Sequence, residues 1–289
     1  MRIVDTALVA IGLAYAFTTP APADELEPSQ HAIEAHRDID YMPGAEYPDA
    51  RDRLDVFMPT QASGSPVIVF FHGGGLLIGD KSQGEFVAKA LVPRGIGVVA
   101  ANYRLSPAVT HPAHVQDAAA AFAWTVAHIA DYGGDPKQVY LAGHSAGAYM
   151  AALLALDDSY LLEVGLSPAA SRGMIAISPF LSVEEVAPDR PKSVWGSDPS
   201  TWRKASPSSY IGSGKPPLFF VYADGDDDWR RDQIEGAVRA FKATGQASVE
   251  AVEVSDRSHL SIVEKLVEPD DPASLHIANF VLGSGNLGQ

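Results

Sequence analysis

The sequence contains no cysteine, which excludes disulfide bonds, thiolate catalysis and metal sites built from thiolates. It is also poor in basic residues: 21 lysines and arginines stand against 36 aspartates and glutamates, giving a formal charge of -15. A charge of this sign repels phosphate backbones and anionic membrane surfaces, and no basic stripe interrupts it. We therefore expect no nucleic-acid partner.

Several motifs of cofactor and metal binding are missing as well. There is no Walker-type Gly-Lys-Ser/Thr, and a G-x-G-x-x-G pattern starting at Gly73 fails because residue 78 is isoleucine. There is no H-E-x-x-H, and His111 and His114 belong to no recognisable set of metal ligands. The sequence thus predicts no cofactor and no required metal.

Long apolar runs are absent except at the start of the chain. Residues Met1–Ala23 have the features of an export signal: a positive Arg2, an apolar stretch from Thr6 to Phe17, and a small-x-small cleavage pattern at Ala21-Pro22-Ala23. The apolar stretch is too short for a comfortable membrane span. We expect an exported protein, periplasmic or secreted, whose mature chain begins near Asp24 and has no membrane span. The alternative is a short apolar helix packed on the domain.

Strand-like and helix-like segments alternate from Arg53 to the end of the chain, as in a mostly parallel, doubly wound α/β sheet flanked by helices. With 289 residues, and no repeat or linker, we expect one domain over residues 24–289. The expected strands are Arg53–Met58, Val67–Phe71, Gly97–Ala101, Gln138–Ala142, Gly173–Ser178, Pro217–Ala223 and Val249–Val254. The expected helices are Ser82–Pro93, Pro112–Ala130, Ala148–Leu156, Arg231–Thr244 and Pro272–Val281.

One segment breaks this alternation. Leu181–Lys215 carries four prolines and three large aromatic residues without a clean period. Long irregular insertions in compact domains often form lids or binding loops. A surface excursion that its aromatic residues anchor to the core is the competing interpretation.

Gly143-His144-Ser145-Ala146-Gly147 matches the G-x-S-x-G pattern between an expected strand and an expected helix. In that context a serine can be held in a strained turn with its hydroxyl exposed, and the N–H of the next residue points at the same reacting carbon. A serine hydroxyl needs a base, usually a histidine that a carboxylate orients. Ser145 is therefore the candidate nucleophile.

Two histidines follow Ser145 in the chain. His276 falls inside the last expected helix, where a surface or packing role is typical. His259 follows the last expected strand after a short polar loop, which places it at the carboxyl end of the sheet beside the serine turn. We take His259 as the candidate base. His72 and His144 precede the serine within glycine turns, and we expect them to fix those turns by hydrogen bonds.

Four carboxylates compete for the role of the acid, because Asp224, Asp226, Asp227 and Asp228 all follow the strand that ends near Ala223. The acid must lie a turn beyond the strand end, so that its carboxylate can point back at the histidine. Asp228, just ahead of the next helix, is our preferred candidate and Asp226 its main rival. Any one of these residues could instead be a turn residue or a helix cap.

The motif His72-Gly73-Gly74-Gly75 directly follows the expected strand Val67–Phe71. Glycines let the backbone approach a ligand closely, and N–H donors are what a tetrahedral oxyanion requires. This loop is the expected source of those donors.

Taken together, these motifs resemble the α/β-hydrolase superfamily, in particular carboxylesterases and lipases of the hormone-sensitive-lipase-like group. The matching segments are His-Gly-Gly-Gly at 72–75, Gly-Asp-Lys at 79–81, Asn-Tyr-Arg-Leu-Ser-Pro at 102–107, Tyr-Gly-Gly-Asp-Pro at 132–136, Gly-His-Ser-Ala-Gly at 143–147 and Ser-His-Leu-Ser-Ile at 258–262. The resemblance implies a triad of Ser145, Asp228 and His259, with an oxyanion hole formed by the N–H groups of Gly74, Gly75 and Ala146.

This resemblance implies a serine carboxylesterase that acts on a small-molecule ester through an acyl-enzyme. The alternatives are an arylformamidase-type amidase and an esterase that removes acetyl or feruloyl groups from polysaccharide. A non-catalytic binding protein on the same fold would be expected to lack part of the triad or the glycines, and none is missing. Leu76-Leu77 replaces the aromatic residue that relatives often carry after the glycines, which changes the expected acyl pocket. The oligomeric state is left open, a homodimer included.

Overall fold

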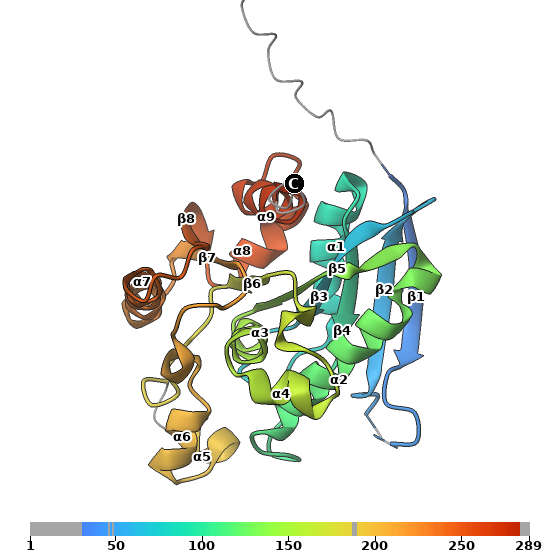
Figure 1. Ribbon diagram of the computed structural model, residues 1–289. Coiled ribbons are helices and arrows are strands. Elements are labelled where there is room, and N and C mark those ends of the chain that lie inside the picture. The colour runs from blue at the N-terminus through green and yellow to red at the C-terminus, as the bar shows by residue number, and fades with distance from the viewer. Residues whose placement is uncertain (1–30, 46, 48, 187–189, 284–289) are drawn as a thin grey trace, which may run out of the picture.

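The computed structural model describes residues 31–45, 47, 49–186 and 190–283. The expected export signal, residues 1–23, lies outside the described residues and stays a prediction. Within the described part, the chain forms one eight-stranded sheet in the order β1-β2-β4-β3-β5-β6-β7-β8 (Figure 1). Strands β3 to β8 pair in parallel, whereas β2 runs antiparallel to both β1 and β4. The expected α/β architecture with a mostly parallel, doubly wound sheet is confirmed.

The central strands β3, β4, β6 and most of β7 are buried, and every expected strand is present, with β5 and β8 extending beyond their expected bounds. The strands are β1 (Ile33–Asp40), β2 (Arg53–Pro59), β3 (Ser65–Phe71), β4 (Gly97–Ala101), β5 (Gly134–His144), β6 (Met174–Ile177), β7 (Leu218–Gly225) and β8 (Val249–Ser258).

Helices cover both faces of the sheet (Figure 1). Residues of α1, α8 and α9 share one core with one face of the sheet, and residues of α2, α3, α4 and α7 share a second core with the other. The helices are α1 (Gly84–Leu91), α2 (Ala113–His128), α3 (Ala146–Leu156), α4 (Asp158–Glu163), α5 (Arg190–Trp195), α6 (Pro199–Lys204), α7 (Asp228–Ala243), α8 (Ser261–Glu264) and α9 (Pro272–Gly283).

Strand β3 shows why the central strands are apolar along their whole length. Val67, Val69 and Phe71 lie in one core, and Ile68 and Phe70 lie in the other. Successive side chains of a strand point to opposite faces, so a strand covered on both faces must be apolar throughout.

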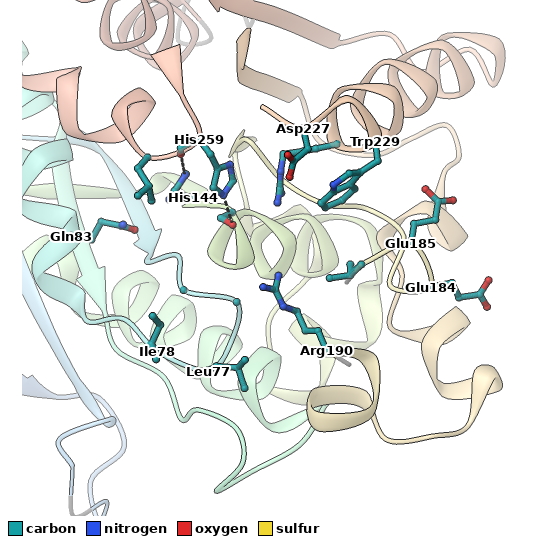
Figure 2. Close-up of a pocket in the computed structure, with 16 residues that line it drawn as sticks. Leu77, Ile78, Gln83, His144, Glu184, Glu185, Arg190, Asp227, Trp229 and His259 are labelled. Carbon is teal, nitrogen blue, oxygen red and sulfur yellow. Dashed lines mark hydrogen bonds between the residues drawn. The ribbon is translucent and has the colours of Figure 1, made fainter. Parts of the chain in front are cut away.

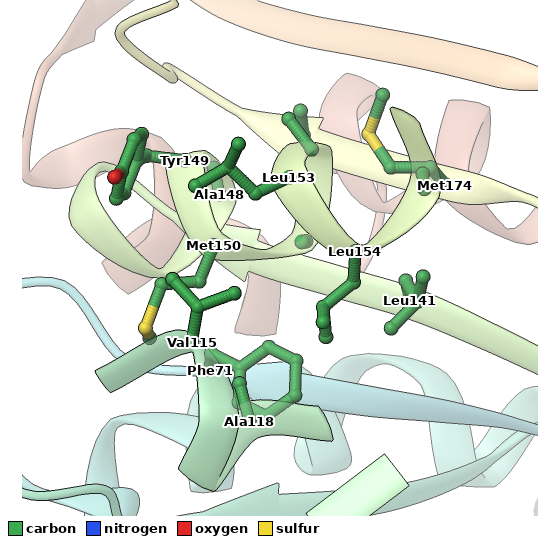
Figure 3. Packing of buried hydrophobic residues seen from close by; sticks show 14 of the residues in the cluster. Phe71, Val115, Ala118, Leu141, Ala148, Tyr149, Met150, Leu153, Leu154 and Met174 are labelled. Carbon is green, nitrogen blue, oxygen red and sulfur yellow. The ribbon is translucent and has the colours of Figure 1, made fainter. Parts of the chain in front are cut away.

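Helix α3 lies at the centre of one core, and every one of its residues is buried. Figure 3 shows Met150 and Leu154 of α3 close to Val115 of α2 and to Leu141 of β5. A helix that is apolar on all sides is typical of an element surrounded by others. Because α3 starts directly after β5, its burial holds the connecting turn firmly in place.

Strand β1 was not expected, because its segment reads as a polar lead. Most of its side chains are exposed, and it pairs only with β2, at the edge of the sheet. An edge strand of this kind needs no apolar alternation, so the hydrophobic pattern gives no sign of it.

The insertion Leu181–Lys215 connects β6 to β7 and contains α5 and α6. Its aromatic residues do anchor it: Trp195 is buried, and its Nε1 donates to the hydroxyl of Tyr149 on α3 at 2.9 Å. Residues of the same insertion also line a cavity at Ser145, and a role of the segment as a lid stays a prediction. No helix within the described ranges combines the length and the apolar character that crossing a bilayer requires.

Candidate active site

Ser145 occupies a sharp turn between β5 and α3. Its backbone has φ 54° and ψ -114°, a left-handed conformation that is strained for a residue with a side chain. The turn is held because Ser145 N–H donates to the carbonyl of Ile177 on β6 at 2.8 Å. Gly147 allows the tight packing, since a Cβ there would collide with the carbonyl oxygen of Phe71. The sequence prediction of a strained serine turn at this position is therefore confirmed.

His259 follows β8 and lies beside this serine. The Ser145 hydroxyl donates to His259 Nε2 at 2.9 Å, and His259 Nδ1 donates to Asp226 Oδ1 at 2.6 Å. A carboxylate only accepts hydrogen bonds, so the ring proton belongs on Nδ1 and Nε2 is free to accept from the serine. His276, in contrast, is exposed on α9.

The structure places Asp226, and not Asp228, against the histidine, so our preference for Asp228 is wrong. Asp228 is the first residue of α7; its side chain is 89% exposed and pairs with Arg231 Nη2 at 2.6 Å. The chain reverses earlier than expected. The N–H of Asp226 donates to the carbonyl of Ala223 at 3.1 Å, and this turn already directs the Asp226 carboxylate back over the end of β7.

The second oxygen of Asp226 is fully engaged as well. Asp226 Oδ2 accepts from the Ser178 hydroxyl at 2.5 Å and from the N–H of Ala223 at 3.0 Å. Burial by itself opposes ionisation of Asp226, but the hydrogen bonds from His259 and Ser178 outweigh it and hold the pKa of Asp226 below its ordinary value. Asp226 is therefore a buried, ionised carboxylate with one oxygen left for the histidine.

The loop after β3 brings three backbone N–H groups to the same place. Gly73 N–H donates to Gln83 Oε1 at 2.7 Å, whereas no acceptor for the N–H groups of Gly74 and Gly75 exists within the described part of the protein. Gly74 has φ 113°, and a Cβ there would collide with the carbonyl of Ile78. Gly74 and Gly75 line the cavity at Ser145, and Ala146, which directly follows the serine, is the first residue of α3.

His72 and His144 hold the loops of the site in place, as expected. His144 Nε2 donates to the carbonyl oxygen of His259 at 2.7 Å, which ties the histidine loop to the serine turn. His72 Nδ1 donates to the carbonyl of Gly73 at 2.7 Å, and the His72 ring stacks on Tyr103. Burial lowers the pKa of His72 to about 4 and that of His144 to about 3, so both rings are neutral at physiological pH.

The motifs Gly-Asp-Lys at 79–81 and Asn-Tyr-Arg-Leu-Ser-Pro at 102–107 hold the segment that follows the glycine loop. Asn102 Oδ1 accepts from the N–H of Lys81 at 2.7 Å, and Asn102 Nδ2 donates to Asp80. Lys81 Nζ in turn pairs with the buried Asp55 at 2.6 Å. The motifs Gly-Asp-Lys and Asn-Tyr-Arg-Leu-Ser-Pro therefore position the loop and do not reach the serine.

Ser145 and His259 open into a cavity of about 1070 Å³ (Figure 2). One side of it is apolar, with Leu77, Ile78 and Leu260. The opposite side comes from the insertion and from the start of α7. It contributes Glu184, Glu185, Val186, Arg190, Asp227, Trp229 and Arg230.

Sequence reasoning missed four residues of this site: Gln83, Ser178, Arg190 and Arg230. Ser178 directly follows β6, at the same edge of the sheet as the serine turn, and this position is a signal that could have been used. Arg190 lies in the aperiodic insertion, where the sequence pattern gives no such signal.

The comparisons with known proteins agree with this fold. A family model described as BD-FAE matches residues 54–172. Esterase LipQ of Mycobacterium tuberculosis is 31% identical over 241 residues, which is 77% of this chain and 56% of LipQ. Kynurenine formamidase of Salmo salar is 27% identical over 225 residues, 76% of this chain and 74% of that protein. The chain thus spans little more than half the length of LipQ.

Among solved structures, the apo form of Thermogutta terrifontis esterase 2 is similar with a TM-score of 0.71 at 22% identity, covering 90% of this chain and 96% of that chain. This likeness speaks for the fold. Fold, motif order, family model and relatives agree: the chain belongs to the α/β-hydrolase superfamily, and its His-Gly-Gly-Gly and Gly-x-Ser-x-Gly motifs are similar to those of carboxylesterases and lipases.

Proposed function

We propose that the protein hydrolyses carboxylic esters through an acyl-enzyme formed on Ser145. The observation that carries the proposal is the unbroken chain of hydrogen bonds from Ser145 Oγ through His259 to Asp226, at 2.9 and 2.6 Å. The similarity to esterase LipQ over most of this chain supports the same reaction class.

In this mechanism His259 Nε2 takes the proton of Ser145 as the oxygen attacks the ester carbonyl. The protonated ring then gives that proton to the departing alcohol, which leaves an acyl-serine. Water attacks the acyl-serine next and loses its proton to His259, which returns that proton to Ser145 Oγ as the bond to the acyl group breaks and the carboxylic acid is released. Asp226 keeps the ring in the required tautomer and stabilises its charged form, because its carboxylate is buried and ionised.

The negative charge that develops on the carbonyl oxygen requires donors that are already in place. We assign this role to the N–H groups of Gly74, Gly75 and Ala146. Those of Gly74 and Gly75 have no acceptor among the described residues, and that of Ala146 is free as the first of a helix. Removing one such donor costs on the order of 10²- to 10³-fold in rate in comparable hydrolases.

A fluorophosphonate probe tests the proposal, because it reacts only with an activated serine. We expect stoichiometric labelling of the wild-type protein and none of Ser145→Ala. Ser178→Ala provides the matched control, since it removes a neighbouring serine hydroxyl but leaves the nucleophile. An unlabelled wild-type protein that melts cooperatively would refute the proposal.

A formamidase activity is the second candidate, and the similarity to kynurenine formamidase over 74% of that protein favours it. The two activities share the triad and differ in the bond that is cleaved. Turnover of formylkynurenine, of acetylated and feruloylated xylan, and of 4-nitrophenyl esters of increasing chain length distinguishes them. Strong turnover of formylkynurenine with negligible ester hydrolysis would replace our assignment by the formamidase.

A further inference from the structure

An arginine side chain faces the proposed oxyanion hole. Arg190 is the first residue of α5, and its guanidinium lies against Gly75: a Cβ placed on Gly75 would be 3.2 Å from Arg190 Cζ and 3.3 Å from Nη2. Figure 2 shows this side chain directed into the cavity, toward the glycine loop and the serine. Arg190 therefore reaches from the insertion to the place where an ester carbonyl would bind.

Within residues 31–45, 47, 49–186 and 190–283, the Arg190 guanidinium forms no hydrogen bond and no ion pair. Two acidic residues on the same side of the cavity, Glu184 and Glu185, do not neutralise it, and the third, Asp227, lies near Arg230. Glu184 and Glu185 are exposed and point away from Arg190 in Figure 2, and Glu185 accepts from Gln233 Nε2 at 2.9 Å.

A second guanidinium, that of Arg230, lies close by and is paired with Asp226. Arg230 is buried, at 5% exposure, and donates from Nη1 to the carbonyl of Ser178 at 2.8 Å; its Nε, 3.7 Å from Asp226 Oδ1, has no hydrogen-bond partner among the described residues. Burial lowers the pKa of Arg230 to about 10, and the charge of Arg190 acts in the same direction, so the two cations are close enough to repel each other. Both belong to a protein whose formal charge is -15.

Trp229 covers the face of the Arg230 guanidinium at 4.6 Å, and Asp227 lies close enough to raise the pKa of Arg230. Arg230 is therefore held by Asp226, Asp227 and Trp229 and is not available to a ligand. Arg190 differs, because its donors have no acceptor among the described residues. A guanidinium has a planar fork of N–H donors that matches a carboxylate with two parallel hydrogen bonds.

We propose that Arg190 binds a carboxylate carried by the substrate, so that the natural substrate is an anionic ester. This inference rests on the proposed function, since it concerns the same cavity and the same serine. The carboxylate belongs either to the acyl part or to the alcohol part of the ester, and the two sources share the chemistry that Arg190 recognises. Arg190 is then a specificity residue, and the bond-breaking steps remain with Ser145, His259 and Asp226.

Two pairs of esters test the proposal. For the acyl side, 4-nitrophenyl hemiadipate is compared with 4-nitrophenyl hexanoate, which has the same chain length but no charge. For the alcohol side, 4-acetoxybenzoate is compared with phenyl acetate. Each pair is measured with the wild-type protein and with Arg190→Gln, Arg190→Lys and Lys192→Gln. Lys192 is an exposed cation on the same helix, so Lys192→Gln controls for the change in net charge.

For one of the two pairs, we expect Arg190→Gln to reduce kcat/KM for the anionic ester about 10- to 100-fold, mainly through KM, and to change the neutral ester by less than about twofold. The kcat/KM of Arg190→Lys for the anionic ester should lie between those of the wild type and Arg190→Gln, because lysine keeps the charge and loses the planar fork of donors. Lys192→Gln should behave as the wild type. The pair that responds identifies which part of the substrate carries the carboxylate.

Equal loss on the anionic and neutral members of both pairs, or no loss on any ester, would overturn the assignment of Arg190. Retention of activity by Arg190→Lys and unchanged melting temperatures exclude misfolding as the cause of a loss. Failure of the proposed function looks different. In that case the wild-type protein hydrolyses neither neutral nor anionic esters and is not labelled by the fluorophosphonate.

Discussion

Replacing Asp226 by asparagine provides the sharpest test of the site, because the structure fixes how the new amide must lie. Asp226 Oδ2 accepts from both the Ser178 hydroxyl and the N–H of Ala223. The carbonyl oxygen of an asparagine has to occupy that position, since its NH₂ group cannot accept a hydrogen bond. The NH₂ group is thereby directed at His259 Nδ1, where the carboxylate oxygen now lies.

This orientation reverses the tautomer of the base. With an NH₂ donor at Nδ1, the histidine ring carries its proton on Nε2, which faces Ser145 and can no longer take the serine proton. A wrong tautomer of this kind reduces kcat by about 10⁴-fold in serine hydrolases, equivalent to about 5 kcal/mol of transition-state stabilisation. We expect Asp226→Asn to lose activity to this extent on 4-nitrophenyl butyrate, with a melting temperature close to that of the wild type.

Asp228→Asn is the matched control, because it makes the same chemical change two residues further along the chain. Its side chain is 89% exposed, and the substitution breaks only a surface pair with Arg231, so we expect kcat to change by less than about twofold. The reasoning is refuted if Asp228→Asn is the inactive variant. It is also refuted if a folded Asp226→Asn keeps more than about a tenth of the wild-type kcat.

Three further predictions follow from other contacts. Ser178→Ala removes a hydrogen-bond donor to Asp226, so the pKa of this carboxylate rises. We expect the acid limb of the pH profile of kcat to move to higher pH and kcat to fall about three- to tenfold. An acid limb that stays in place would contradict this. Trp195→Phe deprives the Tyr149 hydroxyl of its indole donor and should lower the free energy of unfolding by about 1–3 kcal/mol in urea titrations, with activity on neutral esters retained. Buried histidines that stay neutral in the fold become protonated in the unfolded chain below pH 6.5, so the unfolded state binds more protons and stability falls with pH down to about pH 4. The histidines concerned are His72, His111, His114 and His144. Each contributes about 1.4 kcal/mol per pH unit, or about 8 kcal/mol for the four at pH 5, and a free energy of unfolding that is flat between pH 7 and pH 5 would exclude this account.

The central strands and long helices could be predicted because their burial demands a pattern that the sequence displays. Strand β4, for example, has the bounds Gly97–Ala101 that its apolar run predicts. Strand β1 could not be predicted, since an exposed edge strand places no such demand on its side chains. The short helices α5 and α8 are similarly invisible, because four to six residues are too few to show a helical period.

Some residues of the site could likewise be predicted from the sequence and others could not. Ser145 and His259 could be located because motif and chain order constrain them, and the structure brings their side chains together. The choice between Asp226 and Asp228 depends on one hydrogen bond, from the N–H of Asp226 to the carbonyl of Ala223, which closes the turn earlier than composition suggests. Arg190 could not be predicted, because it lies in an irregular insertion whose course across the site is set by tertiary packing and not by a local sequence pattern.

The hydrogen bond from His144 Nε2 to the carbonyl of His259 also bears on how this site can change by mutation. The side chain at the second position of the Gly-x-Ser-x-Gly motif is thereby tied to the backbone of a loop that lies 115 residues further along the chain. A library that randomises residue 144 should recover side chains with a donor at the same reach, or else variants with a compensating change in the histidine loop. When the histidine loop is replaced by that of another hydrolase, the chimera should therefore stay active more often if residue 144 is also replaced by the corresponding residue of that hydrolase.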